Sequence, residues 1–261
     1  MAGEILFLVL VVGVAFVPSL WYMVRLRNLE RYNRNSWLSV FYAFSWGAVA
    51  AVVLTIILTV MFGERIDSFR PTNVDADLYG AVFVAPVVEE SAKALGLLPL
   101  VLARRWEEED GLVLGAASGL GFAATENLLY EYNELLTGTV VSWAVLALLR
   151  SLTSTVLHAS ATSMSGWGLS KWRLAAESKG AVGFVGGFFV FAVFLATAML
   201  MHGLFNLFAS LGLIYGGEAA AILISLLLVF IFAGGVYRFT RRKIQELDRR
   251  GPDFRPARPQ A

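Results

Sequence analysis

Two adjacent glutamates and a lysine interrupt an apolar stretch of the chain. Glu89, Glu90 and Lys93 lie within an apolar run at about 78–102. An ionisable residue at the centre of a bilayer costs about 2.5–3.5 kcal/mol on insertion scales, so such groups persist mainly where a site, a relay or an ion pair requires them. Helical residues four apart share a face, so we expect Glu89 to pair with Lys93 and Glu90 to point elsewhere. Two carboxylates that share one proton provide both an acid and a base, and the alternative is a structural ion pair.

Further polar side chains lie on the next three apolar runs. They are Glu126, Asn127, Arg150, His158, His202 and Asn206. The two histidines are the only ones in the chain, and both fall inside apolar runs. Four consecutive runs therefore contribute acid, base or donor groups, and the remaining runs contribute none. This division predicts a catalytic or transport core that is surrounded by peripheral helices.

The spacing of these groups predicts which of them share a helix face. One polar seam consists of Ser151, Thr155, His158 and Thr162, separated by four, three and four residues. A seam of this period must face the bundle interior, although its hydroxyls often only bond the backbone one turn back. His202 and Asn206 are four apart, which aligns two hydrogen-bond donors.

Glu126 follows a run of small residues at 115–124. Small residues let helix backbones approach closely in membranes, so we expect a tightly packed helix that ends near an acid. For Glu126 alone, a salt bridge to Arg150 is the structural alternative.

The composition is that of a membrane protein. Hydrophobic residues make up 57% of the chain and charged residues only 16%, against about one quarter charged in soluble domains. Runs long enough to cross a bilayer, about 20 residues each, occur at about 5–24, 38–62, 78–102, 112–130, 140–169, 181–213 and 219–239. We therefore expect an all-α, polytopic membrane helical bundle with about seven transmembrane helices.

The basic residues predict the orientation of that bundle, because short cytoplasmic loops collect Lys and Arg. With seven spans, the loop Lys and Arg residues fall on one side except for Arg65 and Arg70. This predicts an N-terminus outside and a cytoplasmic C-terminus in the plasma membrane. We expect one transmembrane domain over 1–240, a catalytic core at about 78–213, and a basic tail over 241–261 that is disordered at its end.

Several chemistries are excluded or weakened by the sequence. The absence of cysteine removes disulfides, thiolate catalysis and thiolate metal ligands. All six Asp residues lie in loops or the tail, which excludes an aspartyl pair in the membrane, and no HExxH helix motif is present. A serine mechanism with Ser118 and His202 would leave the glutamates unused. The net charge of +1 gives no indication of nucleic-acid binding.

One ordered set of motifs resembles a known family. The motifs are Glu89-Glu90-x-x-Lys93, Gly121-Phe122-x-x-x-Glu126-Asn127, Arg150 with His158, and His202-x-x-x-Asn206. In this order on successive runs they resemble the PrsW family of membrane proteases, and through it the CAAX-protease and bacteriocin-processing (ABI) superfamily. The resemblance covers about 87–207. Where the wider group has histidine after Phe-x-x-x, this chain has Glu126, as the PrsW branch does.

The resemblance implies a glutamate-type intramembrane endopeptidase. Glu89 would be the general base for water, assisted by Glu90 or Glu126, and His202 and Asn206 would donate to the oxyanion. His158 would belong to the catalytic set without a defined role. The supporting residues would be Lys93, which sets the charge of the pair, Asn127, and Arg150, which anchors helices. The substrate would be a single-span or membrane-anchored protein, cut in or near its membrane segment. No cofactor is expected.

The site forms only if the helices extend past their hydropathy limits. We expect the helix of Glu126 to continue to about residue 135 and the helix of His158 to reach 169. His158 would then lie within side-chain reach of Glu89 or Glu126.

Three alternatives stay open at this point. A zinc-dependent protease could use His158, His202, Glu89 and Glu126 as ligands. A proton-coupled transporter could use the same groups as a relay, although we see no internal repeat of the kind common in carriers. A scaffold that recruits partners through its tail would function equally well with Glu89→Gln.

Overall fold

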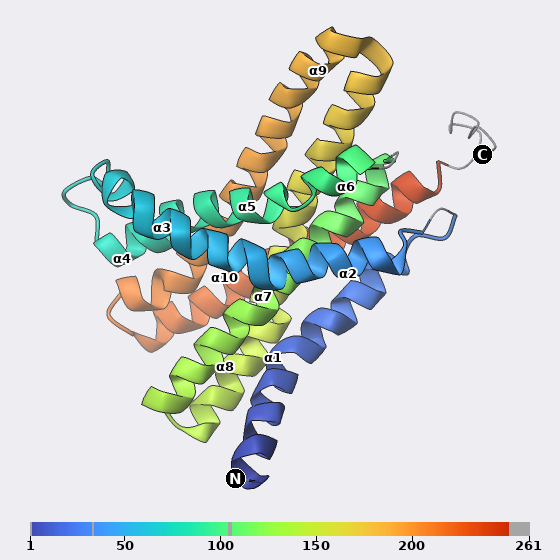
Figure 1. Ribbon diagram of the computed structural model, residues 1–261. Helices are drawn as coiled ribbons and strands as arrows, with labels where there is room; N and C mark the ends of the chain where they lie inside the picture. The colour runs from blue at the N-terminus through green and yellow to red at the C-terminus, as the bar shows by residue number, and fades with distance from the viewer. Residues whose placement is uncertain (1, 33, 104–105, 251–261) are drawn as a thin grey trace.

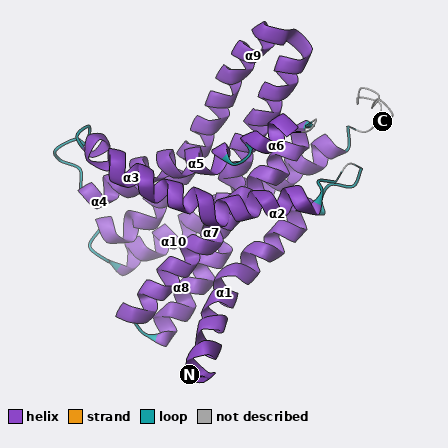
Figure 2. Cartoon of the chain, in the orientation of Figure 1, coloured by secondary structure: helices purple, strands orange, loops and turns teal. Residues whose placement is uncertain are grey.

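The computed structural model describes residues 2–32, 34–103 and 106–250, and these residues form helices joined by short loops (Figures 1 and 2). The first part of the chain contains α1 (Ala2–Arg27), α2 (Trp37–Ser45), the π-helix η1 (Trp46–Ala51), α3 (Val52–Asp67), α4 (Ala76–Tyr79), the π-helix η2 (Gly80–Val84), α5 (Ala85–Leu95) and α6 (Leu98–Ala103). The second part contains α7 (Glu108–Thr137), α8 (Val140–Leu152), α9 (Ser154–Ile214) and α10 (Ala219–Asp248). The all-α class that the sequence predicts is confirmed.

Five helical segments of the described chain are long and apolar enough to cross a membrane. They are Phe7–Arg27, Trp37–Arg65, Glu108–Thr137, Val140–Ile214 and Ala219–Asp248. The run at 78–102 is not among them, because Glu89, Glu90 and Lys93 lie within the continuous helical stretch that α4, η2 and α5 form. The protein is therefore a multi-pass membrane protein, while the count of seven crossings and the orientation of the termini stay predictions.

Two breaks shape the segment Val140–Ile214. α8 and α9 meet at Thr153, whose φ of −122° and ψ of −67° lie outside the helical region, so the single helix expected over 140–169 was wrong. Ser151 consequently lies on α8, apart from the rest of the polar seam. Gly180 has a φ of 55°, which a residue without a Cβ adopts readily, and there α9 turns back into two antiparallel limbs (Figure 1).

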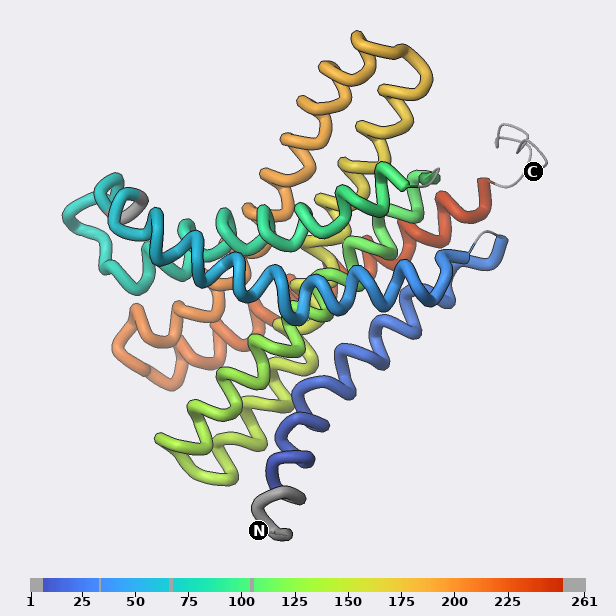
Figure 3. Tube along the Cα trace, viewed as in Figure 1, coloured from blue at the N-terminus to red at the C-terminus, as the bar shows by residue number. Residues whose placement is uncertain are grey.

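Helix α7 forms the centre of the bundle. It contacts α1, α2, η1 and both α8 and α9, and in Figure 3 it passes between the N-terminal helices and the limbs of α9. Glycines allow this packing: a Cβ on Gly119 would collide with the carbonyl oxygen of His158, and one on Gly121 with the carbonyl oxygen of Phe44. The run of small residues on α7 therefore sets the distance at which α9 presents His158.

The expected boundary between the transmembrane domain and the basic tail falls inside the last helix. α10 continues to Asp248, so the expected tail begins inside a helix. The disordered end expected after residue 249 lies mostly outside the described residues, and the boundary at 240 stays a prediction.

The close approach of α7 and α9 predicts a large effect of one methyl group. Gly119→Ala should destabilise the protein by about 1–3 kcal/mol, because the added Cβ meets backbone that must move. Gly234→Ala on α10 is the matched control, since a Cβ there meets nothing within 4 Å. The control should melt at or slightly above the wild-type temperature, because alanine is the better helix former. Thermal melting of the purified protein in detergent measures both, and equal melting of the two variants would contradict this packing.

Candidate functional site

Lys93 is the centre of a buried cluster. Its Nζ donates to Glu90 Oε1 at 2.8 Å and to Glu89 Oε2 at 3.2 Å, and lies 2.9 Å from His158 Nδ1. The Lys93 side chain has no exposed surface, and its ammonium lies 3.9 Å from the centre of the Phe122 ring. The positive charge of Lys93 thus compensates two carboxylates in the apolar interior.

The expectation that Glu90 points away from Lys93 was wrong. Helical residues three apart also lie on neighbouring positions of one face, and Glu90 uses that spacing to reach Lys93. Thr162 donates to Glu90 Oε2 at 2.8 Å, and His202 Nδ1 lies 3.1 Å from Glu90 Oε1. Thr162, which we expected to serve only as a structural hydroxyl, therefore orients one member of the acid pair.

Glu89 and Glu90 differ in their surroundings. Both oxygens of Glu90 are engaged and its side chain has no exposed surface. Glu89 is bonded through Oε2, its other oxygen makes no hydrogen bond to the described part of the chain, and its side chain is 10% exposed. Glu89 Oε2 also lies 3.9 Å from His202 Nε2, a separation at which one water can contact both atoms.

His158 joins the lysine cluster to Glu126. Its Nε2 lies 2.9 Å from Glu126 Oε2, so His158 is within the side-chain reach that we expected. An ammonium has no acceptor, so His158 Nδ1 accepts from Lys93 and Nε2 donates to Glu126. The His158 and His202 rings pack edge to face with centroids 4.7 Å apart. The extension of α7 past residue 135 and of α9 past residue 169 makes this convergence possible.

Arg150 fixes Glu126 and Asn127 at the edge of the cluster. Its guanidinium donates to Glu126 Oε2 at 2.7 Å and to Asn127 Oδ1 at 2.8 Å. Asn127 in turn donates to Thr155 at 2.9 Å. α7, α8 and α9 are thus joined by one polar network, and the salt bridge considered for Glu126 and Arg150 is present. The guanidinium also lies 3.9 Å from the centre of the Tyr130 ring, a contact that the sequence pattern did not indicate.

Two candidate residues lie outside the cluster. Asn206 Nδ2 donates to the carbonyl oxygen of Ala81 at 2.7 Å, and so fastens α9 to the π-helix η2. Asn206 makes no hydrogen bond to the glutamates in the described part of the chain, and its expected oxyanion role stays a prediction. Ser118 donates to the Lys93 carbonyl oxygen at 3.1 Å. It makes no hydrogen bond to His202 in the described part of the chain, so the two residues do not form the pair that a serine mechanism would need.

The cluster also has the ligand chemistry of a metal site. Glu89, His158 and His202 are buried, and each offers one ligand atom within 4.8 Å of the others. Two imidazoles and a carboxylate form one of the ligand sets of catalytic zinc. In each histidine one ring nitrogen faces a carboxylate, Glu126 for His158 and Glu90 for His202. Such outer carboxylates commonly orient metal-binding histidines, so these residues fit a divalent ion.

The central role of Lys93 predicts strong destabilisation when its charge is removed. Lys93→Met should cost about 3–5 kcal/mol, because it leaves a buried carboxylate without its cation. Adding Glu90→Gln should recover part of that loss. The control is Lys171→Met, whose partner Glu108 lies 2.8 Å away and whose side chain is 31% exposed; about 1 kcal/mol or less is expected there. Denaturation in detergent measures all four proteins, and a Lys93→Met effect no larger than that of Lys171→Met would contradict the assignment.

Comparison with known proteins identifies the family of this chain. The family model described as PrsW family intramembrane metalloprotease matches residues 35–234. The Protease PrsW of Clostridioides difficile (strain 630) is 29% identical over 122 residues, which cover 46% of this chain and 50% of that protein. The chain thus spans half the length of the curated relative that it matches, and no solved structure matches significantly. The relation to the CAAX-protease and ABI superfamily stays a prediction. Because the family model covers most of the chain and includes every residue of the cluster, this protein belongs to the PrsW family of intramembrane proteases.

Proposed function

We propose that this chain is a multi-pass endopeptidase of the plasma membrane that hydrolyses a peptide bond in or near the transmembrane segment of a membrane-protein substrate. The observation that carries the proposal is the cluster of Glu89, Glu90, Lys93, His158 and His202 inside the helix bundle. Family membership supports proteolysis over transport, and a scaffold would have no use for a buried acid cluster. The substrate is expected to be a single-span or membrane-anchored protein, because a soluble chain has no access to this depth.

Glu89 is the residue best suited to activate the attacking water. It is the member of the acid pair with exposed surface and with an oxygen that lacks a partner among the described residues. A carboxylate held in this way accepts the proton from water as the water attacks the scissile carbonyl. Glu90 instead holds Lys93, Thr162 and His202 in place, so we assign it a positioning role.

His202 lies between the two glutamates. Its Nδ1 lies 3.1 Å from Glu90 Oε1 and its Nε2 lies 3.9 Å from Glu89 Oε2. His202 is therefore placed to orient the water beside Glu89, and its donation to the oxyanion remains part of the proposal. Lys93 is the nearest cation to the site and provides the positive charge that favours a developing oxyanion.

Two features of the site bear on metal dependence. If a metal is bound, Glu89, His158 and His202 would hold it, and the ion would lower the pKa of a bound water and polarise the scissile carbonyl. The Lys93 ammonium lies 2.9 Å from His158 Nδ1 and 3.2 Å from Glu89 Oε2, and its charge opposes a second cation at those atoms. This favours the metal-free, glutamate-type form of the reaction, while zinc is the second candidate because the ligand set fits it.

Removal of the base should abolish cleavage without unfolding the protein. Glu89→Gln is expected to lower the cleavage rate by about 100- to 10,000-fold, the usual range for general-base catalysis. Glu64→Gln, an exposed acid at the end of α3, is the control and should cleave at the wild-type rate. The assay is cleavage of a panel of single-span substrates in liposomes, with melting temperature as the check on folding. A folded Glu89→Gln protein that cleaves normally would refute the assignment.

Chelation separates the two forms of the reaction. Cleavage in EDTA should continue at the untreated rate, and metal analysis of the purified protein should find less than stoichiometric zinc. Loss of cleavage in EDTA with recovery on adding zinc would instead make Glu89, His158 and His202 metal ligands.

A further inference from the structure

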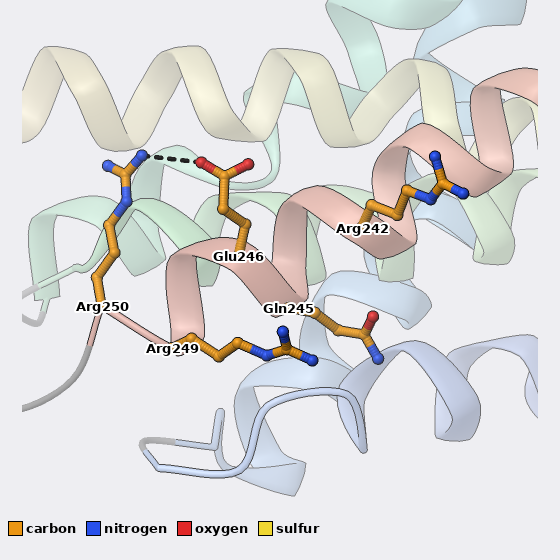
Figure 4. Close-up of a pocket in the computed structure, with 5 residues that line it drawn as sticks. All are labelled: Arg242, Gln245, Glu246, Arg249 and Arg250. Atoms are coloured by element: carbon orange, nitrogen blue, oxygen red, sulfur yellow. Dashed lines mark hydrogen bonds and ion pairs between the residues drawn. The ribbon is translucent and has the colours of Figure 1, made fainter.

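The end of α10 carries two grooves that the peptidase site does not use. Their volumes are about 470 and 310 Å³. The first is lined by Arg242, Gln245, Glu246, Arg249 and Arg250, and is shown in Figure 4. The second continues toward the apolar part of the helix along Gly235, Arg238 and Phe239. It shares Arg242 and Glu246 with the first, and Lys243 completes its lining. Together they form one continuous surface, which we call the α10 groove.

Three arginines of the α10 groove have no acidic partner among the residues that the structure describes. Lys243 and Arg250 each bind Glu246 at 3.0 Å, and Figure 4 shows the Arg250 contact as a dashed line. Arg238, Arg242 and Arg249 make no ion pair or hydrogen bond with any residue that the structure describes. All three are exposed. A cluster of unpaired guanidinium groups is a binding surface for an anion.

The helix places these three charges on one line. At about 100° per residue, positions 238, 242 and 249 fall within an arc of about 40° on the α10 surface. Guanidinium groups bind phosphate through two parallel hydrogen bonds and carry a weaker hydration shell than ammonium groups. The repeated use of arginine on this line thus favours a phosphate over a diffuse counter-ion.

The α10 groove is apolar at its other end. A Cβ on Gly235 would meet nothing within 4 Å, and Phe239 is 48% exposed. These residues directly follow the apolar part of a helix that is long enough to cross a membrane. At 30 residues the helix is about 45 Å long, more than the roughly 30 Å of the hydrocarbon core, so its basic end lies at headgroup level.

The basic end of α10 is held in place by the rest of the fold. Asp248 accepts hydrogen bonds from the backbone N–H groups of Arg31 at 3.0 Å and Tyr32 at 3.2 Å. These bonds fasten the last turn of α10 to the connection between α1 and α2. The arginine line therefore exists before any ligand binds, which lowers the entropic cost of binding.

We propose that the α10 groove binds one anionic phospholipid. The phosphate contacts Arg238 and Arg242, with Arg249 adding to the positive potential, and an acyl chain lies against Gly235 and Phe239. A soluble anion would use only the basic end of the surface, whereas a phospholipid matches both ends. This site is independent of the acid–histidine cluster and of the proposed peptidase activity.

The test is lipid binding to the full chain in detergent, measured by native mass spectrometry with phosphatidylglycerol, phosphatidylcholine and inorganic phosphate as probes. Arg238→Gln/Arg242→Gln should weaken phosphatidylglycerol binding by about 100-fold, since the charge-assisted hydrogen bonds of each guanidinium to the phosphate contribute about a factor of ten. The matched control is Arg25→Gln/Arg241→Gln, which removes the same charge from exposed arginines that stack on Trp21 and Tyr237. It should bind as the wild type does.

A second variant tests the apolar end without changing charge. Gly235→Leu has space for its side chain and should weaken phosphatidylglycerol several-fold while melting like the wild type. Equal losses in the two arginine variants would overturn the proposal, because they would show a general charge effect. Equal binding of phosphatidylcholine, or inorganic phosphate binding as tightly as the lipid, would also overturn it, because the site would then select no anionic lipid.

Discussion

The structure depends on the compensation of buried charge around Lys93. Two carboxylates and an ammonium in an apolar bundle are stable only when they contact one another, because each alone carries a desolvation penalty of several kcal/mol. Lys93 is within 3.2 Å of both glutamates. His202 shares Glu90 Oε1 with Lys93, and Thr162 binds the remaining oxygen of Glu90. The residue of the pair left partly uncompensated is Glu89, and this asymmetry gives two chemically identical side chains different roles.

The surrounding helices are arranged to make this compensation possible. Glycines on α7 bring its backbone against α9, so that His158 and Thr162 reach the acids on α5. The reversal at Gly180 returns the chain, so that the second limb of α9 delivers His202 to the same point. Asn206 and Gly203 then pack against the π-helix η2, which fastens that limb to the segment preceding α5. The π-helix η2 thus lies beside the site, whereas the reversal at Gly180 acts from the far end of the α9 limbs (Figure 1).

The sequence revealed the members of the site better than their contacts. Ionisable groups in apolar runs are costly, so their positions in the sequence alone indicated the site. These residues are Glu89, Lys93, Glu126, His158 and His202. Their partners depend on rotamers and on helix rotation. For that reason Glu90 was wrongly directed away from Lys93, and the bond of Asn206 to Ala81 was not foreseen. The break at Thr153 was missed because neither glycine nor proline marks it. Thr162 was underrated because a hydroxyl on a helix usually bonds its own backbone, and here it bonds Glu90 instead.

The central claim is that Glu89 activates water and Glu90 holds the cluster together. The most direct measurement compares the isosteric variants Glu89→Gln and Glu90→Gln for both melting temperature and cleavage of one single-span substrate. The account predicts that Glu89→Gln melts near the wild-type temperature and does not cleave, whereas Glu90→Gln melts at a clearly lower temperature because Lys93 and His202 lose a charged partner. The reverse result, a stable and inactive Glu90→Gln protein beside an active Glu89→Gln protein, would contradict it.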